Sequence, residues 1–399
     1  MTKDAFPEAM PRIVSRRAAM RTMGAAAGVL AFAGAVRAQQ APAANAALGT
    51  PASVISQPPR DFSPGANPAT YPDPDVLVLD REFARLRVNS PIKRLHTGGI
   101  FMEGPAWSSQ GNYLIWSDIP ADTQYRYLED DGHISVVRHP ANHANGNAFD
   151  FQGRLVTCEH LTRRVVRYEH DGSATVLAEA WKGKRLNSPN DIIVHPDGSY
   201  WFTDPPFGNS IINGQPDAGD SKTPQVLNNR AGYTAGSGAL KIELPANTYR
   251  IDPSGRIDLV LSAEDFGRAP NGLAFSPDYK KLYLVGGAQL WSFDMSPNGK
   301  SIRNQKLFSD LMVDGIRCGA DGMRVDIRGN VYAPSNAGAN FGYGGVTVWN
   351  PEGKLIGRIR LPEAAANLTF GGPRRDRLFI TASQSLYALY LETQGASPF

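Results

Sequence analysis

Residues 196–202 read PDGSYWF, in which a tight-turn signal is followed at once by a short aromatic strand signal. Glycine supplies a positive φ in such turns, and aspartate hydrogen-bonds its own backbone. The same order recurs in DDGHISVV (130–137), DFQGRLVT (150–157), HDGSATVL (170–177) and DIRGNVY (326–332). Each instance predicts a β-hairpin, and no comparable series of helical periods accompanies them. We therefore expect an all-β protein.

A short polar segment precedes one strand of each larger repeat. These polar segments are EGP (103–105), NGN (145–147), PND (189–191), PNG (270–272), DGM (321–323) and NLT (367–369). Their Glu, Asn or Asp residues at 103, 145, 190, 271, 321 and 367 are spaced by 42, 45, 81, 50 and 46 residues. Units of about 40–50 residues with radial repetition are typical of β-propeller blades. The spacing of 81 fits one unit plus an insertion between Phe207 and Thr248. Six segments predict a six-bladed β-propeller, with residues 72–100 closing the ring.

The first 38 residues are expected to be an export signal. Arg16 and Arg17 precede a 14-residue apolar run from Met23 to Val36, and small residues then offer a cleavage site at Ala38. Paired arginines before a mildly apolar run resemble a twin-arginine signal, and the run is too short to span a membrane. We expect the twin-arginine machinery to deliver the protein to the periplasm or outside the cell, without a membrane anchor in the mature form.

Composition separates an arm at residues 39–71 from the propeller domain at residues 72–399. The arm is rich in Ala, Pro, Gln and Ser without apolar periodicity, which predicts a linker or disordered segment. The chain carries 41 basic and 38 acidic residues, and without residues 1–38 it carries 35 and 36. A near-neutral mature chain gives no electrostatic reason to expect nucleic acid as a partner.

The two cysteines, Cys158 and Cys318, are too few for a disulfide framework. Two interpretations stay open: they pair in an oxidising compartment, or they are two buried free thiols. They also lack the clustered spacing of a zinc site.

The polar segments are expected to form one site, because equivalent positions of successive blades point at a common axis. They bring together Glu, Asn and Asp oxygens without a Cys or His cluster, which favours a hard divalent cation such as calcium. A single Asn-Gly or Asp-Gly pair is more typical of a turn. The recurrence of the segments in register therefore carries the prediction of a central metal site.

Several longer motifs resemble those of the gluconolactonase and senescence-marker-protein family. They are MEGPAW (102–107), NSPND (187–191) with WFTDPPFG (201–208), PNGLAFSPD (270–278), DGMRVD (321–326) and, as in bacterial members, NLTFGG (367–372). The resemblance covers about residues 75–390. It implies a six-bladed propeller with one central divalent metal, calcium first and zinc, magnesium or manganese as alternatives. It also implies hydrolysis of a small-molecule lactone, such as glucono-1,5-lactone.

Carried over motif by motif, the resemblance makes Glu103, Asn271 and Asp321 the principal metal ligands. Asn190 lies in the substrate and metal zone, as a ligand or as a substrate contact. Asp321 is the leading general base, because a ligand carboxylate can hold a spare oxygen near bound water. A role for Asp321 as a ligand only stays open.

The second blade supplies the other candidates. Asn145 and Asn147 are expected to hydrogen-bond sugar hydroxyls. His160, at the end of a strand, is the second catalytic candidate, because a channel-facing ring would bind substrate hydroxyls or relay a proton. A structural histidine bonded within its blade is the alternative, and Asp204 is more typical of a residue that closes a blade.

Two other functions fit the same pattern. One is a metal-dependent hydrolase acting on aryl esters, aromatic lactones or phosphotriesters, and the other is a calcium-binding propeller without catalysis. Propellers host many functions, so the fold alone does not choose among them. A substrate panel at fixed metal concentration separates the three.

Overall fold

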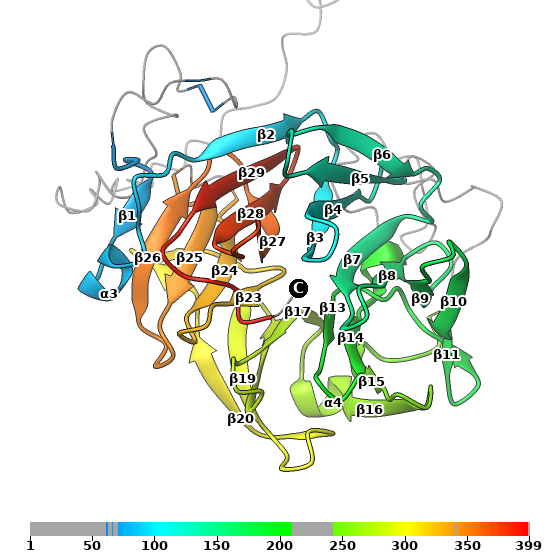
Figure 1. The fold of residues 1–399 in the computed structure, drawn as a ribbon. Coiled ribbons are helices and arrows are strands. Elements are labelled where there is room, and N and C mark those ends of the chain that lie inside the picture. Colours follow the sequence, from blue (N-terminus) through cyan, green and yellow to red (C-terminus); the bar gives the residue numbers. More distant parts are fainter. Residues whose placement is uncertain are drawn as a thin grey trace, which may run out of the picture. The chain divides into compact units, whose positions relative to one another are not determined.

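The computed structural model describes residues 61–62, 66, 71–209, 242–338, 340 and 342–397. All of them belong to the compact unit of residues 42–399, and the predicted export signal lies outside the described residues. Six antiparallel sheets of four or five strands stand in a ring (Figure 1). The prediction of an all-β, six-bladed propeller is confirmed. Within the described residues, no helix is both long enough and apolar enough to cross a membrane.

The blades follow one another along the chain, and the first strand named for each blade is the innermost. Blade 1 contains β3 (Met102–Ser108), β4 (Tyr113–Asp118), β5 (Thr123–Leu128) and β6 (Ile134–Arg138). Blade 2 contains β7 (Ala144–Phe149), β8 (Leu155–Glu159), β9 (Arg164–Tyr168) and β10 (Ala174–Ala178). Blade 3 contains β13 (Ile192–Val194), β14 (Tyr200–Asp204), β15 (Asn247–Ile251) and β16 (Ile257–Leu261).

Blade 4 is built from consecutive strands, whereas blades 5 and 6 each add a strand from the N-terminal part of the domain. Blade 4 contains β17 (Pro270–Phe275), β18 (Lys281–Gly286), β19 (Gln289–Met295) and β20 (Ile302–Ser309). Blade 5 contains β23 (Arg324–Val325), β24 (Val331–Ser335), β25 (Gly345–Trp349), β26 (Leu355–Arg360) and β1 (Val76–Val78). Blade 6 contains β27 (Ala365–Gly371), β28 (Arg377–Ala382), β29 (Ser385–Tyr390) and β2 (Lys93–Thr97).

The remaining elements are short, and all except the 3-10 helix, which follows β14 within blade 3, connect strands of different blades. They are the hairpins β11 (Ala180–Trp181) with β12 (Lys184–Arg185) and β21 (Met312–Val313) with β22 (Ile316–Arg317), the helices α3 (Arg81–Ala84) and α4 (Ala263–Phe266), and the 3-10 helix η1 (Pro206–Asn209).

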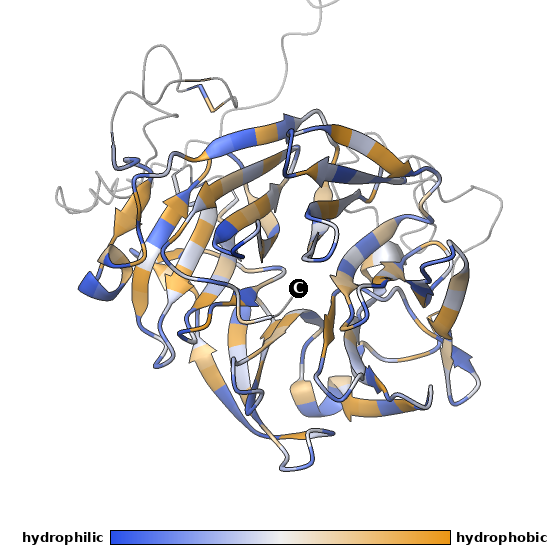
Figure 2. Cartoon of the chain, viewed as in Figure 1, coloured by the Kyte–Doolittle hydropathy of each residue, from blue (hydrophilic) through white to orange (hydrophobic). Residues whose placement is uncertain are grey.

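The repeated turns form as their residues predict. In blade 3 the turn before β14 places Gly198 at a φ of 82°, and the Asp197 carboxylate accepts the Ser199 amide at 2.9 Å. Figure 2 shows the result across the ring, with apolar residues along the strands and polar residues at the connecting turns. The local turn chemistry therefore fixes where each hairpin reverses.

The ring is closed by the N-terminal part of the domain. Strand β2 pairs with β29, with Lys93 opposite Ala388, so one blade contains strands from both ends. Strand β1 adds to the outer edge of blade 5, with Val76 opposite Ile359. The prediction that residues 72–100 close the ring is confirmed.

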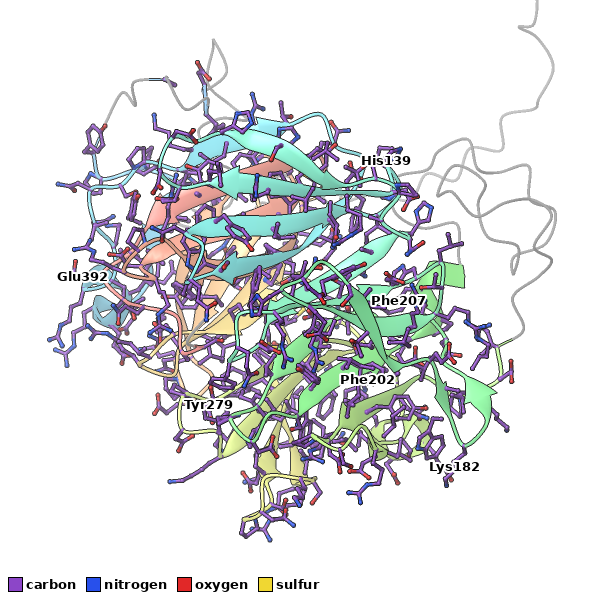
Figure 3. The ribbon with its side chains drawn as sticks, turned by 45° about the vertical axis from the view of Figure 1, so that its right-hand side comes forward. His139, Lys182, Phe202, Phe207, Tyr279 and Glu392 are labelled. Atoms are coloured by element: carbon purple, nitrogen blue, oxygen red, sulfur yellow. The ribbon has the colours of Figure 1, made fainter. Side chains whose placement is uncertain are left out.

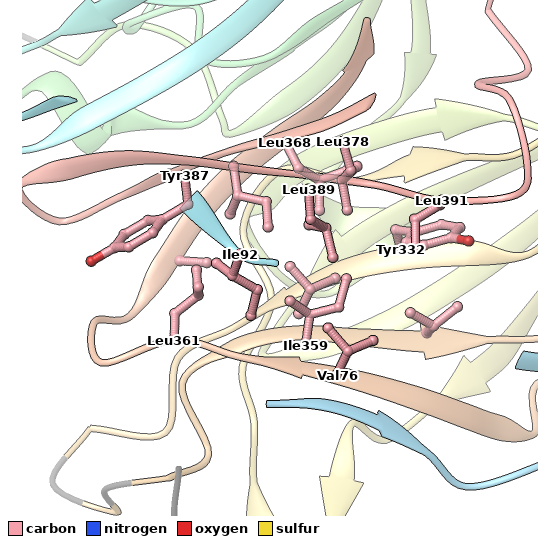
Figure 4. Close-up of a cluster of buried hydrophobic side chains, with 14 of the residues drawn as sticks. Val76, Ile92, Tyr332, Ile359, Leu361, Leu368, Leu378, Tyr387, Leu389 and Leu391 are labelled. Carbon is pink, nitrogen blue, oxygen red and sulfur yellow. The ribbon is translucent and has the colours of Figure 1, made fainter. Parts of the chain in front are cut away.

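Apolar side chains fill the spaces between blades. The largest cluster joins blades 5 and 6 to the N-terminal segment, where Val76 and Ile92 pack with Ile359, Leu378 and Leu389 (Figure 4). Phe202, in the second strand of blade 3, is buried between blades in the same way. By contrast, His139 and Lys182 lie in connecting turns and are exposed to solvent (Figure 3). Interleaved packing of this kind holds the inner strands at fixed positions around the axis.

The structure bears on the two cysteines and on the predicted arm. Cys158 and Cys318 are both buried free thiols, so the free-thiol interpretation is the one that the structure supports. Phe62, which falls in the predicted arm, is 4% exposed and packs edge-on against Tyr387 at 6.0 Å. The arm therefore contributes at least one side chain to the core.

The C-terminal segment ends among the inner strands. After β29 it runs toward the middle of the ring (Figure 1). The Ile327 amide donates to the Gln394 carbonyl at 2.9 Å, and the Ala396 amide donates to the Val325 carbonyl at 2.9 Å. Residues 396 and 397 line a cavity of about 70 Å³ between the inner strands, which we call the lower cavity.

Glycines within the polar segments allow neighbouring blades to approach closely. A Cβ at Gly272 would lie 2.1 Å from the Asp321 carbonyl oxygen, and the Gly272 amide donates to that oxygen at 3.1 Å. Gly272→Ala is therefore expected to lower the free energy of unfolding by about 2–3 kcal/mol, because blades 4 and 5 must separate. Urea unfolding of the purified protein measures the change.

Gly319→Ala is the matched control for this substitution. Its Cβ would meet other atoms only at 3.6 Å or more, and Gly319 does not need a positive φ. A change within about 0.5 kcal/mol is expected. Equal losses in the two variants would show that close blade contact is not the cause.

Candidate functional site

The six polar segments lie at the starts of the six innermost strands, and we call their meeting place the hub. Glu103, Asn145 and Asn271 lie within β3, β7 and β17. Asn190 lies two residues before β13 and Asp321 three residues before β23, and the sixth segment begins at Asn367 in β27. The antiparallel sheets place all these starts at one end of the propeller, as the spacing predicts.

Irregular strand pairing accompanies these segments in four blades. The register between the first two strands shifts between Glu103 and Ala106 in blade 1, and after Ala144 in blade 2. It also shifts after Pro270 in blade 4 and after Ala365 in blade 6. A β-bulge bends a strand and redirects its side chains. The bulges therefore turn polar side chains of the inner strands away from the ordinary alternation.

Hydrogen bonds between amide side chains connect the hub from blade to blade. Asn145 Nδ2 donates to Asn190 Oδ1 at 2.8 Å, and Asn190 Nδ2 donates to Asn271 Oδ1 at 2.7 Å. Asn367 Nδ2 donates to Glu103 Oε2 at 2.9 Å. These bonds fix the orientation of each amide oxygen while leaving it a second lone pair.

Three carboxyl groups share the hub. Burial raises the pKa of Glu103 well above its usual range, and the negative charges of Asp321 and Asp191 raise it further. Burial together with the charge of Asp191 raises the pKa of Asp321 to about 7, although the Asn271 amide lowers it. Burial also raises the pKa of Asp191, against the lowering effect of Arg324. The charges at the hub thus repel one another in the absence of a cation.

The residues present fit a hard divalent cation. Glu103 and Asn190 are buried, and Asn271 and Asp321 are partly exposed. Among the described residues, no three His, Cys, Asp or Glu side chains form a metal cluster by themselves. The candidate set instead combines two carboxylates with two amide oxygens, which are ligands that calcium accepts. A cation there would offset the repulsion that raises the two pKa values.

His160 lies beside Asn145 and is 1% exposed. Its Nε2 atom is 3.3 Å from Asn145 Nδ2, and its Nδ1 atom has no hydrogen-bond partner among the described residues. Burial, with the nearby His143, lowers the pKa of His160 to about 3. The ring is therefore neutral near pH 7, with one nitrogen still able to hydrogen-bond.

Asn147 is completely buried and its amide is occupied within the protein. Its Nδ2 atom donates to the Gly104 carbonyl at 2.8 Å and to Ser117 Oγ at 2.9 Å. Its Oδ1 atom accepts from Gln124 Nε2 and from Thr157 Oγ1, each at 2.8 Å. No capacity is left for a substrate hydroxyl, so the role of Asn147 is to join the inner strands of blades 1 and 2.

Asp204 also has a structural position. Its carboxylate accepts the backbone amides of Asn187 at 2.8 Å and Ser188 at 2.9 Å. These bonds tie the segment that carries Asn190 to the end of β14. The chain then enters the 208–247 insertion, of which residues 210–241 lie outside the described residues.

Sequence reasoning assigned no role to several hub residues. Asp191 and Arg324 fall inside quoted motifs, and Asn367 opens the sixth polar segment, so their place in the repeat was the available signal. Gln124 lies in the third strand of blade 1 and carries no such signal. Its contact with Asn147 depends on the packing of two blades.

The raised pKa values predict how the metal-free protein responds to pH. Between pH 4 and about 7, the folded protein retains a proton on Asp321 that the unfolded chain releases. The free energy of unfolding should therefore fall as pH rises through this window, by up to about 1.4 kcal/mol per pH unit for one group. Urea unfolding of EDTA-treated protein at pH 5 and pH 8 measures the change.

Asp321→Asn serves as the control for this pH effect, because it removes the titrating group. Its stability should depend less on pH over the same range. Calcium should stabilise the wild-type protein more at pH 8 than at pH 5, since binding displaces bound protons. Wild-type stability that rises steadily from pH 5 to pH 8 would contradict the prediction.

Known proteins share this architecture and these motifs. Residues 101–384 match the family model described as the SMP-30/Gluconolactonase/LRE-like region. A gluconolactonase from Zymomonas mobilis is 29% identical, over 78% of this chain and 84% of that protein. Regucalcin from Bos taurus is 24% identical, over 71% and 83%. The solved structure of a gluconolactonase from Xanthomonas campestris is 32% identical, covers 79% of this chain and 94% of that one, and has a TM-score of 0.66.

Proposed function

This chain belongs to the SMP-30/gluconolactonase/LRE-like family, and we propose that it is a metal-dependent lactonase. The proposed reaction opens a sugar lactone such as glucono-1,5-lactone to its hydroxy acid, with water as the nucleophile. The related gluconolactonases from Zymomonas mobilis and Xanthomonas campestris support lactones as the substrate class. The observation that carries the proposal is the hub, where two carboxylates and two amide oxygens from four blades meet.

Glu103, Asn190, Asn271 and Asp321 are the proposed metal ligands. A bound divalent ion, calcium first and zinc, magnesium or manganese as alternatives, would polarise the lactone carbonyl and stabilise the oxyanion. The hydrogen bonds from Asn145 and Asn367 hold Asn190 and Glu103 in place beforehand. Preorganised donors and ligands need little rearrangement during the reaction.

Asp321 is the proposed general base. Asp321 is partly exposed as a residue, and its position before β23 places it at the end of the inner strands where the polar segments meet. Burial and Asp191 raise the pKa of Asp321 in the metal-free site, and a bound cation would lower it again, so the carboxyl group would be ionised and able to accept a proton from water. The neighbouring Asn271 amide favours the charged, proton-accepting form of the carboxyl group.

His160 and Asn145 are the proposed substrate contacts, together with Asn190. A neutral His160 ring with an unbonded Nδ1 suits a hydroxyl group better than an anion. Because His160 stays neutral above pH 5, it should not add an ionisation to the pH–rate profile near neutrality. We therefore assign His160 to substrate binding in preference to proton transfer.

The proposal is tested by pH-stat hydrolysis with EDTA-stripped protein and metals added back singly. Glucono-1,5-lactone, a pentonolactone, an aromatic lactone, an aryl ester and a phosphotriester form the substrate panel. Metal-restored activity that is highest on a sugar lactone is expected. Higher activity on an ester or phosphotriester would show that these compounds, rather than sugar lactones, are the substrate class. A bound metal without hydrolysis of any substrate would indicate a calcium-binding propeller without catalysis.

For the location of the protein, we propose export by the twin-arginine route to the periplasm or the medium. The support is Arg16 and Arg17 before the apolar run. Replacing both arginines with lysine should leave the full-length protein in the cytoplasmic fraction, whereas wild-type protein should appear cleaved in the periplasmic fraction. Normal export of the double variant would contradict the proposed twin-arginine route.

A further inference from the structure

An ion pair lies beside the proposed metal ligands. Asp191 directly precedes β13 in blade 3, and Arg324 begins β23 in blade 5. Arg324 Nη1 is 3.8 Å from Asp191 Oδ2, and the two side chains are only 13% and 3% exposed. Blade 4 lies between these blades, so the pair reaches across the space enclosed by the inner strands. It joins the blade that carries Asn190 to the blade that carries Asp321.

The carboxyl group of Asp191 lies close to the Leu273 amide and the Asn367 side chain as well as to Arg324. Its Oδ1 atom accepts the Ile192 amide at 3.0 Å. Its Oδ2 atom has no hydrogen-bond partner among the described residues, and the ion pair with Arg324 is its one ion pair within them. A buried carboxylate of this kind needs a nearby positive charge to remain ionised.

The Arg324 side chain also borders the lower cavity. Its Nη1 atom donates to the Met323 carbonyl at 2.6 Å, and its side chain lines that cavity. Most of the remaining lining is apolar, including Trp107, Phe275 and Val325, and the C-terminal residues Ala396 and Ser397 complete it. The guanidinium group is therefore confined between the hub and a small, mainly apolar space.

A count of charges connects this pair with the metal site. Glu103, Asp191 and Asp321 carry three negative charges when ionised, and Arg324 carries one positive charge. One divalent ion would bring the sum to zero. We propose that Arg324 is a built-in counter-cation of the hub, which limits the affinity of the site for a divalent metal by repelling it. The inference rests on the proposed function, because it concerns the same metal site.

Isothermal titration of EDTA-stripped full-length protein with calcium chloride, at one pH and ionic strength, tests this role. Arg324→Met removes the charge but keeps the length, and should tighten calcium binding by at least about tenfold, the scale of a unit charge acting on a divalent ion nearby. Asp191→Asn should weaken binding by a similar factor. The double variant should return to within about threefold of wild type, because both charges are gone.

Three controls isolate the charge from packing. Arg324→Lys keeps the charge and should stay within about threefold of wild-type affinity, whereas Arg324→Gln should behave as Arg324→Met. Arg328→Met removes an exposed charge from the turn after β23 and should leave the affinity unchanged. Thermal unfolding of each metal-free variant identifies any variant that is not folded. If either Arg324→Met or Arg324→Gln is unfolded, the calcium affinity of the other one tests the inference.

The possible outcomes separate this inference from the proposed function. Wild-type protein that neither binds calcium nor loses activity in EDTA would overturn the metal-dependent function and the inference together. Wild-type protein that binds calcium while folded Arg324→Met and Arg324→Gln bind it equally or more weakly would overturn the inference alone. Tighter binding in both variants, reversed by Asp191→Asn, would support it.

Discussion

Asp321→Asn is expected to lower kcat for lactone hydrolysis by at least about a thousandfold while the propeller stays folded. The substitution keeps the size of the side chain but removes a metal-ligand charge and the proposed proton acceptor. It also removes one of the like charges that raise the pKa of Glu103, so the metal-free variant should be more stable than wild type at pH 8. Steady-state kinetics and thermal unfolding measure the two effects.

Metal content distinguishes the two roles of Asp321 that the sequence leaves open. A variant that keeps its metal but not its turnover would identify Asp321 as the base, and one that loses both would identify a ligand. Asp314→Asn makes the same chemical change at an exposed turn between β21 and β22 and should leave kcat unaltered. Near-native kcat in Asp321→Asn would contradict the role as base, whereas a ligand role would remain because an asparagine oxygen can also bind the metal.

Deletion of residues 1–98 is expected to abolish cooperative folding. It removes β1 and β2, which form the outer edges of blades 5 and 6. It also removes Val76, Phe83, Leu86 and Ile92 from the largest apolar cluster. Burial of each such side chain stabilises a protein by about 1.5–3 kcal/mol, so the loss of roughly 6–12 kcal/mol is comparable with the whole stability of a domain, about 5–15 kcal/mol.

Deletion of residues 1–60 is the control for this truncation. It retains Phe62 and all strands of the described residues, and should give a cooperative thermal transition close to that of the chain without its first 38 residues. Circular dichroism and size-exclusion chromatography compare the two deletions. A single sharp transition after deletion of residues 1–98 would show that blade 6 does not need its fourth strand from the N-terminal segment.

The fold could be read from the sequence because its signals are local and repeated. Asp197 and Gly198 specify a turn through their own backbone contacts, wherever the hairpin lies in the molecule. The spacing of the polar segments then predicted the number of blades. The placement of Glu103, Asn190, Asn271 and Asp321 at one end of the ring follows from the same repetition.

The roles of neighbouring polar residues could not be read in this way. Asn145 and Asn147 are two residues apart in one segment, yet Asn145 is hydrogen-bonded to Asn190 whereas Asn147 is buried against Gln124 and Thr157. A β-bulge in the inner strand separates their environments. Sequence spacing predicts which strand a residue occupies but not how a bulge redirects its side chain.

The sequence alone determined the class of fold and the number of blades, since turn and strand preferences act between near neighbours. Only the tertiary structure decided which charges share the hub. Asp191 and Arg324 belong to different blades, and their ion pair exists because the ring brings both blades to one axis. The interaction between two charges depends on their separation in space and on the solvent excluded around them, and the packing of the blades sets both.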